Sequence, residues 1–60
     1  MDKKDFIFEF KKNYQHICVM DNIIEYFFLN LYNKDKSLEI NLDRCSDYIL
    51  SHDLADEVEI

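Results

Sequence analysis

Four side chains in this sequence belong to residue types that bind soft metal ions: His16, Cys18, Cys45 and His52. Two imidazoles and two thiolates would suffice for a tetrahedral zinc site. His16 and Cys18 are two residues apart and would point in different directions on a helix, while Cys45 and His52 are two turns apart. We therefore expect no metal site, and we interpret both cysteines as core residues on apolar faces.

A nucleophilic pair of Cys45 with either histidine is disfavoured by the same spacing. Catalysis also needs a walled pocket, and a helical chain of 60 residues encloses little volume. The chain contains no glycine, so its backbone lacks the residue that lets nucleotide-binding loops approach phosphates closely. We predict no catalytic residues and no cofactor, and we expect that the protein is not an enzyme.

The carboxylates form the clearest pattern, because they are concentrated in the C-terminal part. Through Lys36 the basic and acidic residues balance, whereas from Ser37 onwards a single arginine, Arg44, faces seven acids. The whole net charge of −6 therefore belongs to the segment 37–60. Such an anionic end repels phosphates and membrane headgroups and attracts basic protein surfaces.

Within that segment, Glu39, Asp43 and Asp47 recur every four residues. On a helix they form a row with about 6 Å between neighbours, near the separation of successive phosphates on one nucleic-acid strand. The candidate partner-binding residues are Glu39, Asp43, Asp47, Asp53, Asp56 and Glu57. This pattern favours a small acidic protein-binding module that acts stoichiometrically on a larger partner with a basic surface. A phage or mobile-element inhibitor of a nucleic-acid-processing or host-defence enzyme, acting by acidic mimicry, is the concrete form of this hypothesis. The alternative is that the acids only keep the protein dissolved.

The helical period predicts where these residues sit. A helix is expected at 2–18, capped by Asp2, with a shared apolar face. That face consists of Phe6, Ile7, Phe10, Tyr14, Ile17 and Cys18. Phe6, Phe8 and Phe10 also alternate as a strand would, but the helix accounts for more apolar positions.

Two further helices are predicted at 22–33 and 38–51. Asn22 with Glu25 resembles a capping box, and Ser37 can cap the third helix. The third helix has an apolar face formed by Leu38, Leu42, Cys45, Tyr48 and Ile49, although Leu38, Ile40 and Leu42 would also suit a short strand. A fourth turn near 53–58, capped by Asp53, can follow. We expect one domain, 1–60, folded as a compact all-α three-helix bundle with an acidic segment at 37–60.

The second predicted helix is apolar over more than half of its circumference, which is more than two short neighbours can cover. The residues expected to be left over are Phe8, Phe28, Leu29 and Tyr32. Such a patch favours a homodimer or a similarly apolar partner. The alternative function is therefore an obligate homodimeric structural or regulatory protein.

The sequence also bears on location and on two classes of partner. No unbroken apolar stretch follows Met1, so we expect no secretion signal and a cytoplasmic protein with reduced thiols. The apolar run Tyr26–Leu29 is far shorter than the roughly 20 residues of a membrane span. The only basic cluster, Lys3, Lys4, Lys11 and Lys12, is flanked by acids, so we expect no direct binding of nucleic acid.

Overall fold

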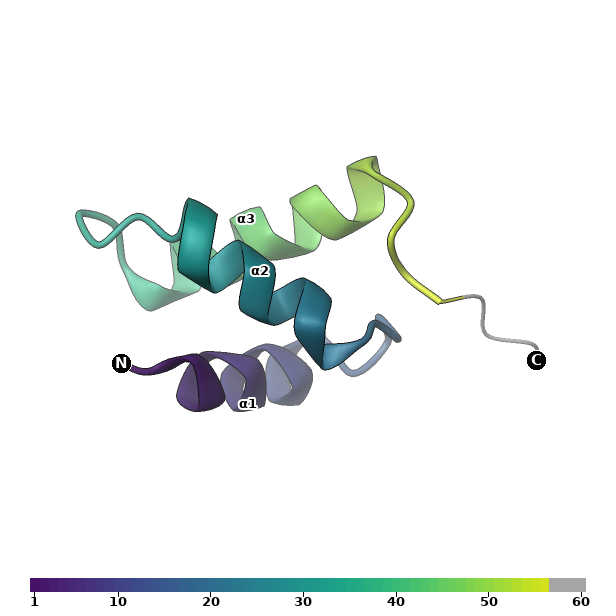
Figure 1. Cartoon of the computed structure of the whole chain (residues 1–60), viewed down its shortest axis with the longest axis horizontal. Coiled ribbons are helices and arrows are strands. Elements are labelled where there is room, and N and C mark those ends of the chain that lie inside the picture. The colour runs from purple at the N-terminus through teal and green to yellow at the C-terminus, as the bar shows by residue number, and fades with distance from the viewer. Residues whose placement is uncertain (57–60) are drawn as a thin grey trace.

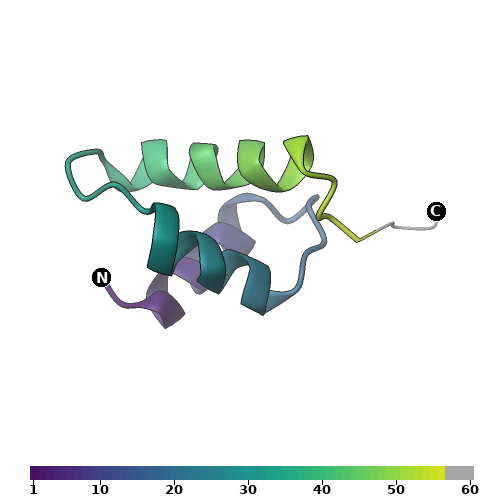
Figure 2. The same cartoon turned by 45° about the horizontal axis from the view of Figure 1, so that its top comes forward.

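The computed structural model describes residues 1–56, which contain three helices and no strand (Figure 1). Helix α1 spans Lys3–Asn13, α2 spans Asp21–Leu31 and α3 spans Leu38–Ser51. The chain reverses direction at each connection, and α2 passes in front of the space between the other two helices (Figures 1 and 2). The predicted all-α three-helix bundle is confirmed.

Helix α1 begins as predicted and ends five residues early. The Asp2 carboxylate accepts a hydrogen bond from the Asp5 N–H at 2.9 Å and caps the helix. At its other end the Asn13 amide donates to the Glu9 carbonyl at 2.7 Å, which offers the backbone an alternative to a further helical turn. The prediction that the helix continues to residue 18 is wrong.

The connection after α1 begins with a turn at Gln15 and His16 and continues as an irregular, partly buried segment. Ile17 and Val19 are buried while Cys18 between them is exposed, which is the alternation of an extended segment. The interpretation of Cys18 as a core residue is therefore wrong. Its carbonyl accepts a hydrogen bond from the Asp56 N–H at 2.6 Å, so the C-terminal part of the described chain is tied to this connection.

Helix α2 starts one residue before the predicted position. Its N-cap is Met20, which makes no side-chain cap bond, so the predicted capping box at Asn22 is wrong. Asp21 instead places a negative charge in the first turn, where the helix dipole favours it. The helix ends at Leu31, and Tyr32 turns its ring edge-on to Phe6 at 5.6 Å between centroids.

Helix α3 has the predicted limits, and its cap is Ser37, whose Oγ accepts from the Ile40 N–H at 3.2 Å. Leu42, Cys45 and Ile49 are buried on the expected face. Ile40 is 47% exposed, so the alternation expected of a strand is not followed.

A Schellman motif ends α3. Asp53 has φ of 54°, in the left-handed region that glycine usually occupies at this position. The Leu54 N–H donates to the Ile49 carbonyl at 2.9 Å and the Asp53 N–H to the Leu50 carbonyl at 3.3 Å. Asp53 therefore terminates α3 and does not cap a new helix. Residues 53–56 are not helical, and the rest of the predicted fourth turn, residues 57 and 58, lies outside the described residues.

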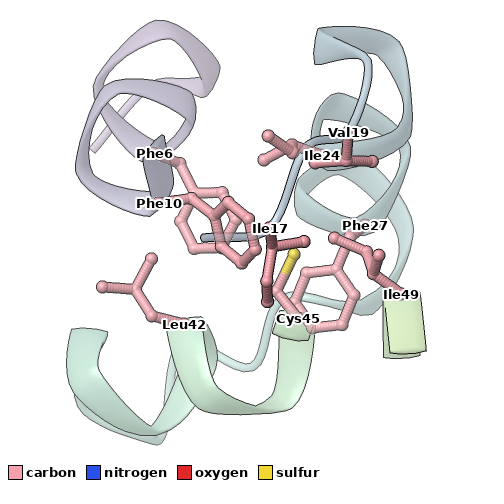
Figure 3. Packing of buried hydrophobic residues seen from close by; sticks show 9 residues of the cluster. All are labelled: Phe6, Phe10, Ile17, Val19, Ile24, Phe27, Leu42, Cys45 and Ile49. Atoms are coloured by element: carbon pink, nitrogen blue, oxygen red, sulfur yellow. The ribbon is translucent and has the colours of Figure 1, made fainter. Parts of the chain in front are cut away.

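The core draws on all three helices and on the first connection (Figure 3). Its buried side chains are Phe6, Phe10, Ile17, Val19, Ile24, Phe27, Leu42, Cys45 and Ile49. Phe6 stacks on Phe27 at 6.1 Å and lies against Phe28 at 5.1 Å, so one ring from α1 packs against the C-terminal half of α2.

A buried amide fixes the connection between α2 and α3. The Asn41 side chain has no exposed surface and donates to the carbonyls of Asn33 at 2.8 Å, Ser37 at 3.0 Å and Lys36 at 3.4 Å. Its own oxygen accepts from the Asn33 N–H at 2.8 Å. Asn41 thereby sets where α3 begins relative to α2, and with it the position of the acidic row.

Candidate protein-binding surface

The three acids of the predicted row lie on the outward side of α3. Glu39, Asp43 and Asp47 are all exposed, whereas the core face of the same helix is buried. A step of four residues advances 40° around a helix, so the row runs obliquely across the outward side. We call Glu39, Asp43 and Asp47 the acidic row. Its carboxylates are separated by about 6 Å along the axis and face solvent.

The acids of α2 are already paired. Within residues 1–56 the ion pairs are Lys3 with Glu25, at 3.0 Å, and Lys11 with Asp21. Both join α1 to α2, so the carboxylates of α2 are compensated within the molecule. No member of the acidic row takes part in either pair, and its charge is directed outward.

The other acidic candidates lie beyond the row. Asp53 and Asp56 are exposed in the segment that follows α3, and Glu57 lies outside the described residues. Asp53 is unfavourable in two ways where it stands. It occupies a left-handed position that glycine adopts with less strain, and it adds negative charge at the C-terminal end of a helix that has no basic residue in its last turn.

The predicted self-association residues divide into two pairs. Phe8 on α1 and Leu29 on α2 are each 63% exposed. Phe28 and Tyr32 are half-buried, 5.0 Å apart between centroids, and both pack on Phe6. The structure therefore brings Phe28 and Tyr32 together at the edge of the core and leaves Phe8 and Leu29 on the outward sides of two different helices.

Sequence reasoning missed several exposed apolar residues. Tyr26 on α2 and Leu50 on α3 are more than half exposed. Leu50, together with Leu31 of α2, lines an open groove of about 770 Å³ that Arg44 and Asp47 flank. The helical period predicts the exposure of Tyr26, because Tyr26 lies about 200° around α2 from the buried Ile24.

The soft-ligand residues are dispersed. Cys45 is buried in the core and Cys18 is exposed on the first connection. Burial raises the pKa of the Cys45 thiol to about 12, so it is protonated at neutral pH. The His52 ring lies 4.6 Å from that of Tyr48 between centroids. In the described part of the chain, no three histidine, cysteine or acidic side chains converge as a metal site requires.

Comparisons with models of protein families, with characterised proteins and with solved structures give no match to this chain. Among residues 1–56, no helix has both the length and the apolar character that a membrane crossing requires.

Proposed function

We propose that this protein is a small acidic binding module that acts stoichiometrically on a protein partner with a basic surface, and that the acidic row is its contact surface. The observation that carries the proposal is the contrast between helices. The carboxylates of α2 are engaged by lysines of α1, whereas those of the acidic row are exposed and outside both ion pairs of the described chain.

The position of Asp53 supports the same proposal. Asp53 lowers stability both through its left-handed backbone conformation and through its charge at a helix C-terminus. Such a residue is expected where function, and not folding, selects it. Asp53 is exposed and adds a negative charge just past the end of α3, six residues after the last member of the acidic row, Asp47. We include it in the contact surface.

The repeat of the acidic row gives the proposal its concrete form. Carboxylates about 6 Å apart on a rigid helix present a charge pattern similar to that of a nucleic-acid strand. The partner is then a nucleic-acid-processing or host-defence enzyme whose basic groove is occluded, and the chain acts as its inhibitor, as proteins of phages and other mobile elements do. In this role the protein contributes binding and no catalytic chemistry.

The test is affinity capture from the native host extract with two variants of equal charge change. Asp43→Lys with Asp47→Lys alters the acidic row, and Asp5→Lys with Asp35→Lys makes the same change in net charge elsewhere. Loss of two close charge pairs is expected to weaken capture by at least about a hundredfold. The control variant should retain the partner, and binding should weaken as salt rises.

Competition then tests mimicry. Single-stranded DNA added to the captured complex should displace the chain if both occupy one basic groove. Equal retention of the partner by both variants would rule out recognition through the acidic row. If DNA fails to displace the chain from its partner, but the Asp43/Asp47 variant fails to capture that partner, the acidic row binds a basic surface that is not a nucleic-acid site. Recognition through the acidic row would then stand and mimicry would not.

A second candidate function rests on the exposed apolar surface of α2. If the protein is an obligate homodimer with a structural or regulatory role, reversing the charge of the acidic row leaves activity intact. A charge at Leu29, which is 63% exposed, abolishes it instead.

A further inference from the structure

The outward sides of the three helices differ in charge. On α1 the exposed residues Lys4, Phe8 and Lys12 recur every four positions, so this side is basic. On α3 the acidic row makes the outward side negative. The outward side of α2 presents Asn22, Tyr26, Leu29 and Asn30, none of which is charged. We call these four residues the neutral face.

This difference decides which surface can meet its own copy. In a twofold interface the same patch is used by both subunits, so charges near the axis face charges of the same sign. A basic α1 side or an acidic α3 side would repel itself. The neutral face has no such penalty, and the neighbouring Glu25 is held by Lys3 at 3.0 Å.

The neutral face also has the residues of a binding surface. Tyr26 is 54% exposed and Leu29 is 63% exposed, and with Asn22, Glu25 and Asn30 they line a shallow hollow of about 290 Å³. Tyrosine is enriched at the centre of protein interfaces because its ring offers apolar area and its hydroxyl a hydrogen bond. Tyr26 and Leu29 of one copy can therefore pack against the hollow beside the same residues of the other copy.

The order of residues on α2 is self-complementary. If two α2 helices pair antiparallel about an axis at Tyr26, each Asn22 stands opposite the partner's Asn30, about 6 Å along the axis from the centre. Each carboxamide has donors and an acceptor. The Asn30 amide gives one N–H to the Tyr26 carbonyl at 2.9 Å, which leaves its oxygen and a second N–H for the other copy.

We propose that a second copy of this chain occupies the neutral face, forming an antiparallel α2–α2 dimer centred on Tyr26. A helix of 11 residues is about 17 Å long, so the contact is smaller than a standard interface. The dimer is accordingly weak and reversible. Its two acidic rows remain outside the contact. The inference does not depend on the proposed basic partner. It concerns the α2 surface of the second candidate function and assigns to it a reversible dimer in place of an obligate one, and its test uses the isolated protein.

Analytical ultracentrifugation over a range of concentrations, at about 0.05 M and about 0.5 M salt, tests the dimer. Two variants form a matched pair, because Leu29 and Phe8 have the same exposed fraction, 63%. Leu29→Lys should weaken dimerisation by at least about tenfold, whereas Phe8→Lys should leave it unchanged. Circular dichroism establishes that both variants fold. Salt should not weaken the wild-type dimer, because no charges pair across it and screening reduces the repulsion between two chains that each have a net charge of −6.

A charge pair tests the register. Asn22→Asp combined with Asn30→Lys places opposite charges across the twofold axis, each at the end of α2 where the helix dipole favours it. This double variant should dimerise about fivefold more tightly than wild type at low salt and lose the gain at high salt.

Three results would overturn the assignment of the neutral face as a dimer interface. The first is a monomer at every concentration, and the second is an equal effect of the Leu29 and Phe8 changes. The third is the formation of oligomers larger than a dimer that dissociate as salt rises. This result would mean that the basic side of α1 binds head to tail to the acidic row of the next copy. A double Asn22/Asn30 variant no tighter than wild type would overturn the antiparallel register centred on Tyr26.

Discussion

Replacement of Asn41 by alanine tests whether one buried amide fixes the position of α3. The side chain is fully buried and joins α3 to the connection from Asn33 to Ser37 through four hydrogen bonds. Alanine keeps the helix-forming tendency and removes all four bonds. The Asn33 N–H loses its partner for one of them, the bond of 2.8 Å to the Asn41 oxygen.

The expected cost follows from the geometry. Three of the bonds, at 2.8, 2.8 and 3.0 Å, have good lengths, and a net contribution of about 1 kcal/mol each gives about 3 kcal/mol. A chain of this size has a total stability of only about 3–9 kcal/mol. Asn41→Ala should therefore remove at least about a third of the stability and lower the melting temperature by about 12–24 °C.

Urea titration followed by far-ultraviolet circular dichroism measures this cost. The control is Asn13→Ala, because the Asn13 amide also donates to a backbone carbonyl four residues earlier, at 2.7 Å, but from an exposed position. Its loss should cost less than about 0.5 kcal/mol. Similar losses for the two variants, or a loss below about 1 kcal/mol for Asn41→Ala, would refute the assignment of Asn41 as the residue that positions α3.

Three further outcomes are expected. Asp53→Gly should raise the unfolding free energy by about 0.5–1 kcal/mol in thermal denaturation, since glycine accepts the φ of 54° without strain; a decrease would mean that the aspartate side chain stabilises the turn. Because burial raises the pKa of Cys45 from 9.0 to about 12, its contribution to stability is complete below pH 9 and is lost as the pH rises towards 12. The unfolding free energy lost at about pH 10 is about 1.4 kcal/mol. Cys45→Ala should remove this pH-dependent loss, and Cys18→Ala should retain it. An equal decrease of unfolding free energy with rising pH in the two variants would contradict the assignment of the loss to Cys45. Thiol titration of the native protein should show rapid reaction of Cys18 and slow reaction of Cys45, and rapid reaction of both would mean that the core opens readily.

The sequence predicted α3 best because its signals are local. Ser37 supplies the cap, and the buried residues Leu42, Cys45 and Ile49 follow one helical period. The same period misled at the end of α1, where Ile17 and Cys18 fit a helix by spacing alone. Their extended conformation depends on burial of Ile17 in the core and on the hydrogen bond from Asp56 to the Cys18 carbonyl, a contact between residues far apart in the chain.

The candidate surface was predictable in part for the same reason. Spacing alone put Glu39, Asp43 and Asp47 in one row on α3. Neither Glu25 nor Asp21 could be recognised as paired, because their lysines lie on another helix. The inward turn of Phe28 likewise depends on where Phe6 lies, and periodicity within α2 does not determine it.

The separation of a basic α1 from an acidic α3, which lie at opposite edges of the view in Figure 1, gives the molecule an electric dipole moment. In the field of a positively charged surface such a molecule rotates during diffusion so that α3 leads and α1 trails. Encounters then begin in a narrow range of orientations and occur faster than random collision allows, and the advantage declines as dissolved ions shorten the reach of the field.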